Sequence, residues 1–215
     1  MDKKLSDYRK SYDKGSLLES TITKNPFELF DQWFKEVEAQ GGVEEVNAMH
    51  ISTLSKEGYP ESRVVLLKHI LDDHFVFYTN YNSQKGKAIA AHPKVGVSFF
   101  WPSLERQVRI RGLATPLDQK QSEAYFNLRP RGSQIGAWAS AQSSTVASRE
   151  ALQESFSFYE KKFADKLIPK PEHWGGYRIA VSAIEFWQGR PNRLHDRIRF
   201  IRNDYGTWDL ERLAP

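Results

Sequence analysis

The chain of 215 residues contains no cysteine. This absence excludes disulfides, thiolate catalysis and the zinc or iron–sulfur sites that depend on cysteine ligands. No run of about 18 consecutive apolar residues occurs, which is the length that a membrane-spanning helix needs, and the first residues, MDKKLSDYRK, lack the apolar segment of a signal peptide. We therefore expect a protein of the reducing cytoplasm that does not enter a membrane.

Sequence motifs for several common ligand sites are also missing. Neither G-x-G-x-x-G nor G-x-x-x-x-G-K-[ST] occurs, so the chain carries no dinucleotide fingerprint and no P-loop, and G-x-S-x-G is absent too. None of the histidines stands in a metal-ligand spacing; they are His50, His69, His74, His92, His173 and His195. We expect no catalytic metal.

Charge and aromatic content say more about possible ligands. The net charge is only +4, and the basic residues stand singly within apolar segments instead of forming one block. This distribution favours separate contacts to small anions such as phosphates over a surface that follows a nucleic acid backbone. Aromatic residues make up 13% of the chain, a content that suits ring-shaped ligands, cores and dimer interfaces alike.

The order of the predicted elements favours an antiparallel barrel or sandwich. Residues 1–24 are polar and predict a flexible arm, followed by a single domain over residues 25–215. A helix is predicted to begin at Pro26 with Asn25 as its cap and to end at Gly41. The predicted strands are 48–54, 62–70, 74–81, 95–101, 107–115, 177–187 and 193–202, the further helices are 84–91, 118–128 and 145–164, residues 129–137 form a basic loop, and the last residues form a tail.

The segment Glu185–Arg197, EFWQGRPNRLHDR, holds two aromatic residues, three arginines and a histidine within 13 residues. If the part from Arg193 onward is extended, Arg193, His195 and Arg197 share one face of a strand. Two permanent cations beside a group that titrates near neutrality could hold an anionic ligand at a reacting centre. A solvated strand edge with ordinary surface charge is the competing interpretation.

Four further segments are weak indications of anion sites when each is taken alone. Arg63 and Lys68 bound an apolar strand, Ser83–Lys87 begins a helix whose N-terminus suits a phosphate, Gln107 lies on a strand face with two arginines, and Arg129–Ala137 combines arginines with small residues. Each has a structural explanation as surface charge or as a helix cap. Together they supply more anion sites than one phosphate needs, which favours two phosphorylated ligands.

The chain resembles the pyridoxine (pyridoxamine) 5'-phosphate oxidases from about Arg9 to its C-terminus. The matching blocks are RVVLLK, FYTN, LERQV, NLRPRGSQIGAW, AQSS, PKPEHWGGYR, EFWQG, RLHDR and ERLAP. The resemblance implies a split β-barrel that works as a homodimer with FMN in the subunit interface. It also implies oxidation of pyridoxine and pyridoxamine 5'-phosphates by oxygen to pyridoxal 5'-phosphate, with hydrogen peroxide, and ammonia from the amine, as further products.

The resemblance assigns residues to three roles. The implied FMN contacts are Arg63, Val64, Val65, Leu66, Leu67, Lys68, Tyr78, Thr79, Gln84, Lys85, Gln107, Gln142, Ser143, Trp187 and Arg197. The implied substrate contacts are Lys68, Tyr125, Arg129, Ser133, Arg193, Leu194 and His195, together with the arm residues Arg9, Lys10, Ser11 and Tyr12, which resemble a segment that closes over substrate. Arg193 and His195 are the implied catalytic residues, with His195 as a candidate proton acceptor.

One departure from the family pattern is visible. Gln84 stands where the family more usually has arginine, and the loss of that cation should weaken a phosphate contact unless Lys87 compensates. Two rival functions remain at this point. Another flavin oxidoreductase or flavin reductase on the same barrel should lack the RLHDR block, and a basic module that binds nucleic acid should carry no chromophore and should bind in a salt-dependent way.

Overall fold

The computed structural model describes residues 4–8 and 10–215, so the implied substrate contact Arg9 lies outside the described residues. The described helices are α1 (Pro26–Gln40), α2 (Gln84–Ala91), α3 (Gln119–Leu128), α4 (Arg131–Ala139) and α5 (Arg149–Lys162), with short 3₁₀ turns η1 (Leu5–Asp7) and η2 (Pro191–Arg193). The described strands are β1 (Ala48–Leu54), β2 (Pro60–Leu66), β3 (His69–Leu71), β4 (His74–Asn80), β5 (Lys94–Trp101), β6 (Arg106–Pro116), β7 (Trp174–Gln188), β8 (Asp196–Arg202) and β9 (Trp208–Arg212).

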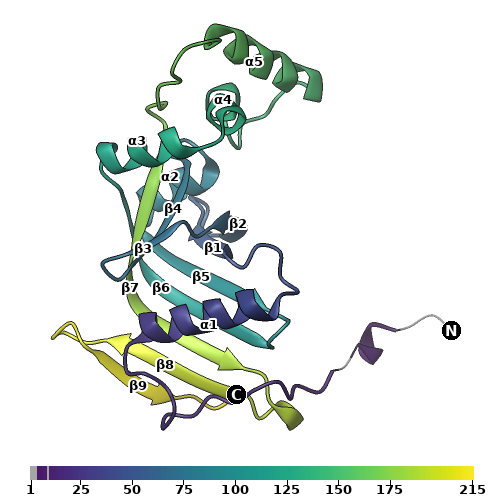
Figure 1. The fold of residues 1–215 in the computed structure, drawn as a ribbon, viewed down its shortest axis with the longest axis vertical. Coiled ribbons are helices and arrows are strands. Elements are labelled where there is room, and N and C mark those ends of the chain that lie inside the picture. The colour runs from purple at the N-terminus through teal and green to yellow at the C-terminus, as the bar shows by residue number, and fades with distance from the viewer. Residues whose placement is uncertain (1–3, 9) are drawn as a thin grey trace. The chain divides into compact units, whose positions relative to one another are not determined.

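All nine of these strands belong to one sheet (Figure 1). The order along it is β2-β1-β5-β6-β7-β4-β3, and β8 pairs with β7 and with β9. The pairs β3–β4, β4–β7, β7–β8 and β8–β9 are antiparallel. The predicted antiparallel, mainly β architecture is therefore confirmed.

The chain divides into two compact units. The terminal unit comprises the chain up to His50 together with Gly96–Arg111 and Val181–Pro215, and the central unit comprises Ile51–Val95 and Gly112–Ala180. Among the described residues, no helix combines the length and the apolar character that crossing a bilayer requires.

In the terminal unit, α1 lies across the strands (Figure 1). Asn25 Oδ1 accepts the Phe27 amide at 2.9 Å, Pro26 occupies the first turn, and Gly41 ends the helix with φ 70°, so the predicted helix and both of its signals are confirmed. Its apolar face packs Phe30 against Phe99, with ring centroids 5.1 Å apart. On β1 of the same unit, the Met49 side chain is fully buried.

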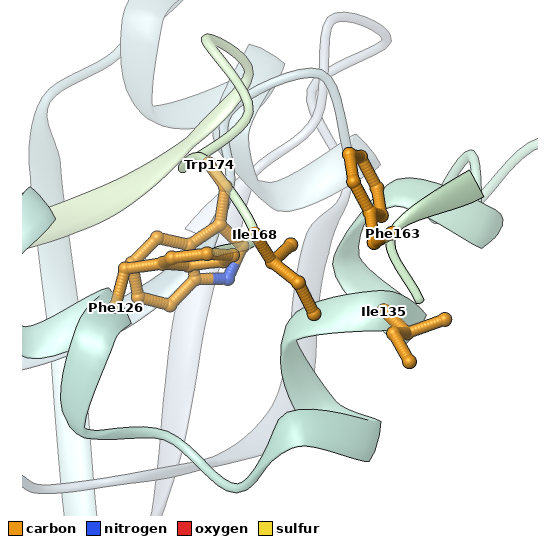
Figure 2. Packing of buried hydrophobic residues seen from close by; sticks show 5 residues of the cluster. All are labelled: Phe126, Ile135, Phe163, Ile168 and Trp174. Carbon is orange, nitrogen blue, oxygen red and sulfur yellow. The ribbon is translucent and has the colours of Figure 1, made fainter. Parts of the chain in front are cut away.

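In the central unit, helices α3, α4 and α5 share a core with the start of β7. Figure 2 shows the buried cluster, in which Ile168 lies between the rings of Phe126 and Trp174 and the side chains of Ile135 and Phe163. Burial of these large apolar groups holds the short helices in place, because isolated helices of this length are marginal in water.

Four sequence predictions differ from the structure. The predicted strand 62–70 is divided into β2, which pairs with β1, and β3, which pairs with β4. Between them, the Lys68 amide donates to Val76 O on β4 at 2.8 Å. The predicted basic loop is largely helix α4, which Ile135 anchors in the cluster. The predicted strand from Arg193 begins only at Asp196, and the predicted C-terminal tail forms β9 by pairing with β8.

Candidate active site

A cavity of ≈ 530 Å³ in the central unit gathers residues from six segments of the chain. We call it the tyrosine cavity, after Tyr78 on β4 and Tyr125 on α3. Eight of the implied FMN contacts line it, namely Val64, Val65, Leu66, Lys68, Tyr78, Thr79, Lys85 and Gln142, as do four of the implied substrate contacts, namely Lys68, Tyr125, Arg129 and Ser133. The structure therefore brings together implied ligand contacts that are up to 78 positions apart in the sequence (Val64 to Gln142).

Three stacked rings form a flat wall of this cavity. The rings of Tyr78 and Tyr125 stack with centroids 3.9 Å apart, and Tyr78 stacks on Trp174 at 5.4 Å with an interplanar angle of 8°. Burial, and then the neighbouring Tyr125 and Tyr81, raise the pKa of Tyr78 to about 12. Tyr78 is therefore neutral at physiological pH, and the wall offers planar, uncharged surface that suits an aromatic ligand.

Gly176 on β7 leaves room for this wall, because a Cβ at that position would lie 2.8 Å from Tyr78 Cε1 and 2.5 Å from Leu117 Cδ1. We expect Gly176→Ala to lower the free energy of unfolding by about 1–3 kcal/mol through overpacking. Gly132→Ala is the matched control, since a Cβ there meets nothing within 4 Å and alanine favours a helix by about 0.5–1 kcal/mol. Urea unfolding of both variants checks this, and equal midpoints would contradict it.

Arg129, at the C-terminal end of α3, presents an unsatisfied donor to the tyrosine cavity. Its guanidinium stacks on Trp174, 4.6 Å from the ring centroid, and its Nη1 is buried without a hydrogen bond to any residue that the structure describes. Burial lowers the pKa of Arg129, although a guanidinium stays protonated. A buried donor of this kind favours an anionic ligand that would satisfy it.

Lys85, in the first turn of α2, is a second cation of the cavity and is buried, with 8% of its surface exposed. Its Nζ lies 3.2 Å from both Thr79 Oγ1 and Gln142 Oε1, which are neutral acceptors. Burial, and then the charge of Arg63, lower the pKa of Lys85. An ammonium held by neutral partners only is poorly compensated, so a phosphate beside it would gain a strong charge-assisted contact.

A second cavity of ≈ 640 Å³ in the central unit shares Val64, Lys85 and Gln142 with the first. We call it the glutamate cavity, because Glu61 joins the implied FMN contacts Arg63, Gln84 and Ser143 in its lining. The Glu61 carboxylate accepts from Arg63 Nη2 at 3.1 Å and from Gln84 Nε2 at 2.6 Å. The departure at Gln84 is thus matched by a carboxylate that binds its amide.

Glu61 places a negative charge where a phosphate would bind Arg63. We expect Glu61→Gln to tighten the binding of FMN about three- to tenfold at low salt, because a competing partner and a like charge are removed. The dissociation constant for FMN is measured by fluorescence titration at 0.05 M and at 0.5 M salt. Glu57→Gln, a change on an exposed turn, is the control. An unchanged or weaker affinity would contradict the prediction.

A third cavity of ≈ 590 Å³ lies in the terminal unit, and we call it the arm cavity. The arm contributes Tyr8, Lys10, Ser11 and Tyr12 to it; the C-terminal region contributes Trp187, Arg190, Asn192, Arg193 and His195. The Tyr12 ring contacts the rings of Trp187 and His195 edge to face, with centroids 5.7 and 5.6 Å away. Arm and C-terminal residues that the resemblance assigns to substrate thus lie together.

The hydrogen bond of His195 fixes its tautomer. The Arg190 amide donates to His195 Nδ1 at 3.1 Å, so the neutral ring carries its proton on Nε2. Arg193 lies beside it with φ 62°, and Asn192 has φ 57°. Successive left-handed residues are uncommon outside glycine and are found at functional sites, and here they turn the chain so that Arg193 and His195 line one cavity without a strand.

Comparison with known proteins decides the family. A family model described as Pyridoxamine 5'-phosphate oxidase matches residues 35–158, and one described as Pyridoxine 5'-phosphate oxidase C-terminal dimerisation region matches residues 174–215. The chain belongs to the pyridoxamine 5'-phosphate oxidase family. The resemblance in the sequence is therefore confirmed.

Relatives within the family match along the whole chain. The chain is 53% identical to the pyridoxine/pyridoxamine 5'-phosphate oxidase of Flavobacterium johnsoniae, covering 98% of each protein, and 49% identical to that of Synechocystis sp., again covering 98% of each. Among solved structures, PhzG from Burkholderia lata, crystallised with tetrahydrophenazine-1-carboxylic acid, matches 96% of this chain and 100% of its own with TM-score 0.86 and 26% identity. A pyridoxamine 5'-phosphate oxidase-related, FMN-binding protein from Nostoc punctiforme matches 90% of this chain and 100% of its own with TM-score 0.71 and 16% identity, and so shares the fold.

Some residues that the family resemblance implies lie outside these three cavities. Leu67 is buried, and Leu194 is 70% exposed, and neither lines a cavity. Gln107 lies on the face of β6 that alternates with buried Val108, as predicted, but it lines none of the three cavities. Arg197 is held by Glu185 Oε1, 2.9 Å from its Nε, and does not share a strand face with Arg193 and His195.

The structure also adds residues that the sequence did not single out. Trp174 forms part of the aromatic wall, Glu61 holds two implied FMN contacts, and Arg190 orients His195. Trp174 lies in the family block PKPEHWGGYR, to which the resemblance assigns no role. Its place in the aromatic wall follows from the pairing of β4 with β7, which brings Trp174 beside Tyr78. Glu61 belongs to no chemical motif, and Arg190 lies in the segment Glu185–Arg197 but acts on His195 through its backbone amide, which no side-chain pattern indicates.

Proposed function

We propose that this protein oxidises pyridoxine 5'-phosphate and pyridoxamine 5'-phosphate to pyridoxal 5'-phosphate with FMN as its cofactor. Molecular oxygen is the electron acceptor and leaves as hydrogen peroxide; the amine substrate also consumes water and releases ammonia. The observation that carries the proposal is the tyrosine cavity, in which two poorly compensated cations accompany a flat aromatic wall: the buried Lys85, and the half-buried Arg129, whose Nη1 is buried without a partner among the described residues. Two phosphorylated aromatic molecules would satisfy both cations.

The residues fit a flavin phosphate at Lys85. Arg63, Lys85, Gln142 and Ser143 line the glutamate cavity and supply two cations, an amide and a hydroxyl, which is the donor set that a phosphate dianion needs. FMN, when bound, supplies the two-electron acceptor that no side chain can provide. The chain's part is to hold the phosphate and to keep the reacting region dry.

Arg129 is proposed to bind the substrate phosphate together with Lys68, Tyr125 and Ser133 in the tyrosine cavity. The buried Nη1 of Arg129 would gain the partner that it lacks among the described residues. Because the guanidinium is already stacked on Trp174, little side-chain entropy is lost when the anion binds. This preorganisation favours a phosphorylated ring over a ring without a phosphate.

Arg193 and His195 are proposed to orient the substituent of the substrate that reacts. Since His195 Nδ1 accepts the Arg190 amide, its Nε2–H can donate a hydrogen bond to that substituent, and action as a base at Nδ1 would require this bond to break. The guanidinium of Arg193 supplies a permanent charge in the same cavity. We assign the ring of His195 the role of a donor that fixes orientation.

The protein is proposed to work as a homodimer with FMN at the subunit interface. The family model's dimerisation region covers residues 174–215, and the implied ligand contacts Trp187, Arg193, His195 and Arg197 all lie within it. An overlap of dimerisation and ligand-contact residues supports a site to which two copies contribute.

The test is a turnover assay in air on protein supplemented with FMN. Pyridoxine 5'-phosphate is added and pyridoxal 5'-phosphate is followed by its absorbance, with controls that lack enzyme or FMN. FMN-dependent product is the expected result. Bound flavin without product from either B6 phosphate would instead favour another oxidoreductase on this fold, and the absence of flavin binding would contradict the assignment of Arg63 and Lys85.

A further inference from the structure

Glu105, in the turn between β5 and β6, is a buried carboxylate to which neither the resemblance nor the proposed reaction gives a role. Only 1% of the residue is exposed, and its backbone is left-handed with φ 58°. Its Oε2 accepts the amides of Asp13 and Lys14 at 2.9 and 3.2 Å. Its Oε1 lies 2.7 Å from Lys10 Nζ.

All three of these partners belong to the N-terminal arm, more than 90 residues away in the sequence. Burial raises the pKa of Glu105, but the bonds from Lys10 and from the Lys14 and Asp13 amides outweigh burial, so the pKa lies below its ordinary value. The carboxylate is therefore ionised at neutral pH. A buried charge that is compensated by the arm alone draws the arm to this position.

The surface beside Glu105 is shaped to receive the arm. The Gly189 amide donates to Glu105 O at 2.8 Å, and a Cβ on Gly189 would lie 2.8 Å from the Tyr12 side chain. Further along, Arg190 Nη1 donates to Gly15 O at 2.9 Å, and Asp196 Oδ2 accepts the Leu17 amide at 3.0 Å. Of these contacts, those of Glu105 are made to the arm segment that itself lines the arm cavity, through Lys10.

The bonds to Glu105 bracket Tyr12. Lys10 on one side and Asp13 on the other are both fixed by the one carboxylate, and the Tyr12 ring between them meets His195 and Trp187. Lys10, Ser11 and Tyr12 line the arm cavity in this position. Without the carboxylate, the described contacts of residues 10–14 would be reduced to the bond from Lys14 Nζ to Ser103 O at 2.6 Å and the ring contacts of Tyr12. No backbone group of this segment would then be held by a residue that the structure describes.

We propose that Glu105 is the positioning residue that seats arm residues 10–14 over the arm cavity and thereby sets the affinity for the phosphorylated substrate. The proposal rests on the proposed function for its second part. Glu105 acts through Lys10 and Tyr12 and does not itself touch substrate. The affinity for substrate then depends on a carboxylate in the turn between β5 and β6.

The first experiment measures how firmly Glu105 holds the arm and does not depend on turnover. Hydrogen exchange followed by mass spectrometry is carried out on the full chain with FMN added, and exchange at residues 10–17 is compared between wild type and Glu105→Gly. Glycine removes the carboxylate and relieves the left-handed backbone, so the fold is retained. We expect exchange of the Asp13 and Lys14 amides to accelerate about tenfold or more.

Two further variants control this measurement. Glu36→Gln removes a neighbouring ion pair with Arg106 that does not touch the arm, and its exchange at residues 10–17 should match wild type. Glu105→Gln keeps one acceptor oxygen for the arm amides but loses the charge, so its exchange should lie between wild type and Glu105→Gly. Unchanged exchange in both Glu105 variants would overturn the proposal.

The second experiment separates binding from chemistry. In Glu105→Gly, KM for pyridoxine 5'-phosphate should rise about tenfold, with a smaller fall in kcat and with FMN affinity within twofold of wild type. Faster exchange with unchanged KM and kcat would overturn the link to substrate. Wild-type protein that turns over no B6 phosphate would overturn the proposed function, and the exchange data would still decide whether Glu105 holds the arm.

Discussion

Replacing Lys85 by methionine should weaken FMN binding about 30- to 100-fold without destabilising the protein that lacks FMN. The loss of affinity follows from removing a charge-assisted contact to a phosphate in a buried setting. The apo-protein should unfold at a temperature equal to or above that of wild type, because a buried lysine whose ammonium has neutral acceptors is replaced by an apolar side chain of similar length. Fluorescence titration with FMN and thermal unfolding of the apo-protein measure the two effects.

Lys87→Met is the matched control for this experiment. Lys87 lies two residues further along the same helix, is exposed, and lines neither cavity of the central unit. Its replacement should leave FMN affinity within about twofold of wild type. Equal losses in the two variants would show that general charge, rather than the buried ammonium, governs binding, and would also restore Lys87 as the compensation for Gln84.

The same charge predicts how the FMN affinity of the wild type depends on pH. The phosphate is bound by the protonated ammonium, so affinity is present below the pKa of Lys85 and is lost as pH rises through it. The pKa lies below its ordinary value of 10.5 in the structure because of burial and then Arg63, and a bound anion raises it again. FMN affinity of the wild type should therefore fall at alkaline pH, and Lys85→Met should lack this fall.

Arg193→Leu should reduce kcat/KM by about a hundredfold or more while FMN remains bound. The guanidinium lines the arm cavity beside His195, and its loss removes a fixed charge from the place where the reacting substituent is proposed to lie. Leucine also cannot donate a hydrogen bond, whereas Arg193→Lys keeps the charge and should recover part of the activity. Steady-state kinetics with both B6 phosphates and the flavin content of the purified variant check this.

Arg202→Leu provides the comparison for Arg193. Arg202 ends β8, is exposed, and stacks on Trp208 rather than on a cavity residue. It should lower kcat/KM by less than about twofold. Near-normal turnover in Arg193→Leu, or loss of flavin from it, would contradict the role assigned to Arg193.

Local signals in the sequence predicted much of the fold. The helix Pro26–Gln40 was predictable because its signals lie at its own ends: Asn25 and Pro26 at its start and Gly41 directly after its last residue. Helix α2 (Gln84–Ala91) was predicted with the bounds that the structure has. Helix α4 was not, because Gly132, Ser133 and Gly136 are poor helix formers and the helix depends on burial of Ile135 against distant residues. Strand β9 depends on pairing with β8, which its own charged sequence does not indicate.

The site was predictable in its members but less so in its geometry. Period-2 spacing placed Arg193, His195 and Arg197 on one strand face, and two left-handed residues before the strand defeat that inference. The grouping of Tyr125, Arg129 and Ser133 with Tyr78 and Lys85 in one cavity depends on tertiary packing, which spacing does not show. Glu61 and Glu105 were missed because a carboxylate that holds other residues has no sequence pattern of its own.

The buried position of Met49 has a consequence for the lifetime of the protein. Hydrogen peroxide, which the proposed reaction releases at every turnover, attacks cysteine thiolates and exposed methionine sulfur most readily. The chain has no cysteine and two methionines, and Met49, the methionine that the structure describes, has no exposed surface. The fold thus shields this sulfur from the oxidant that the proposed reaction would release.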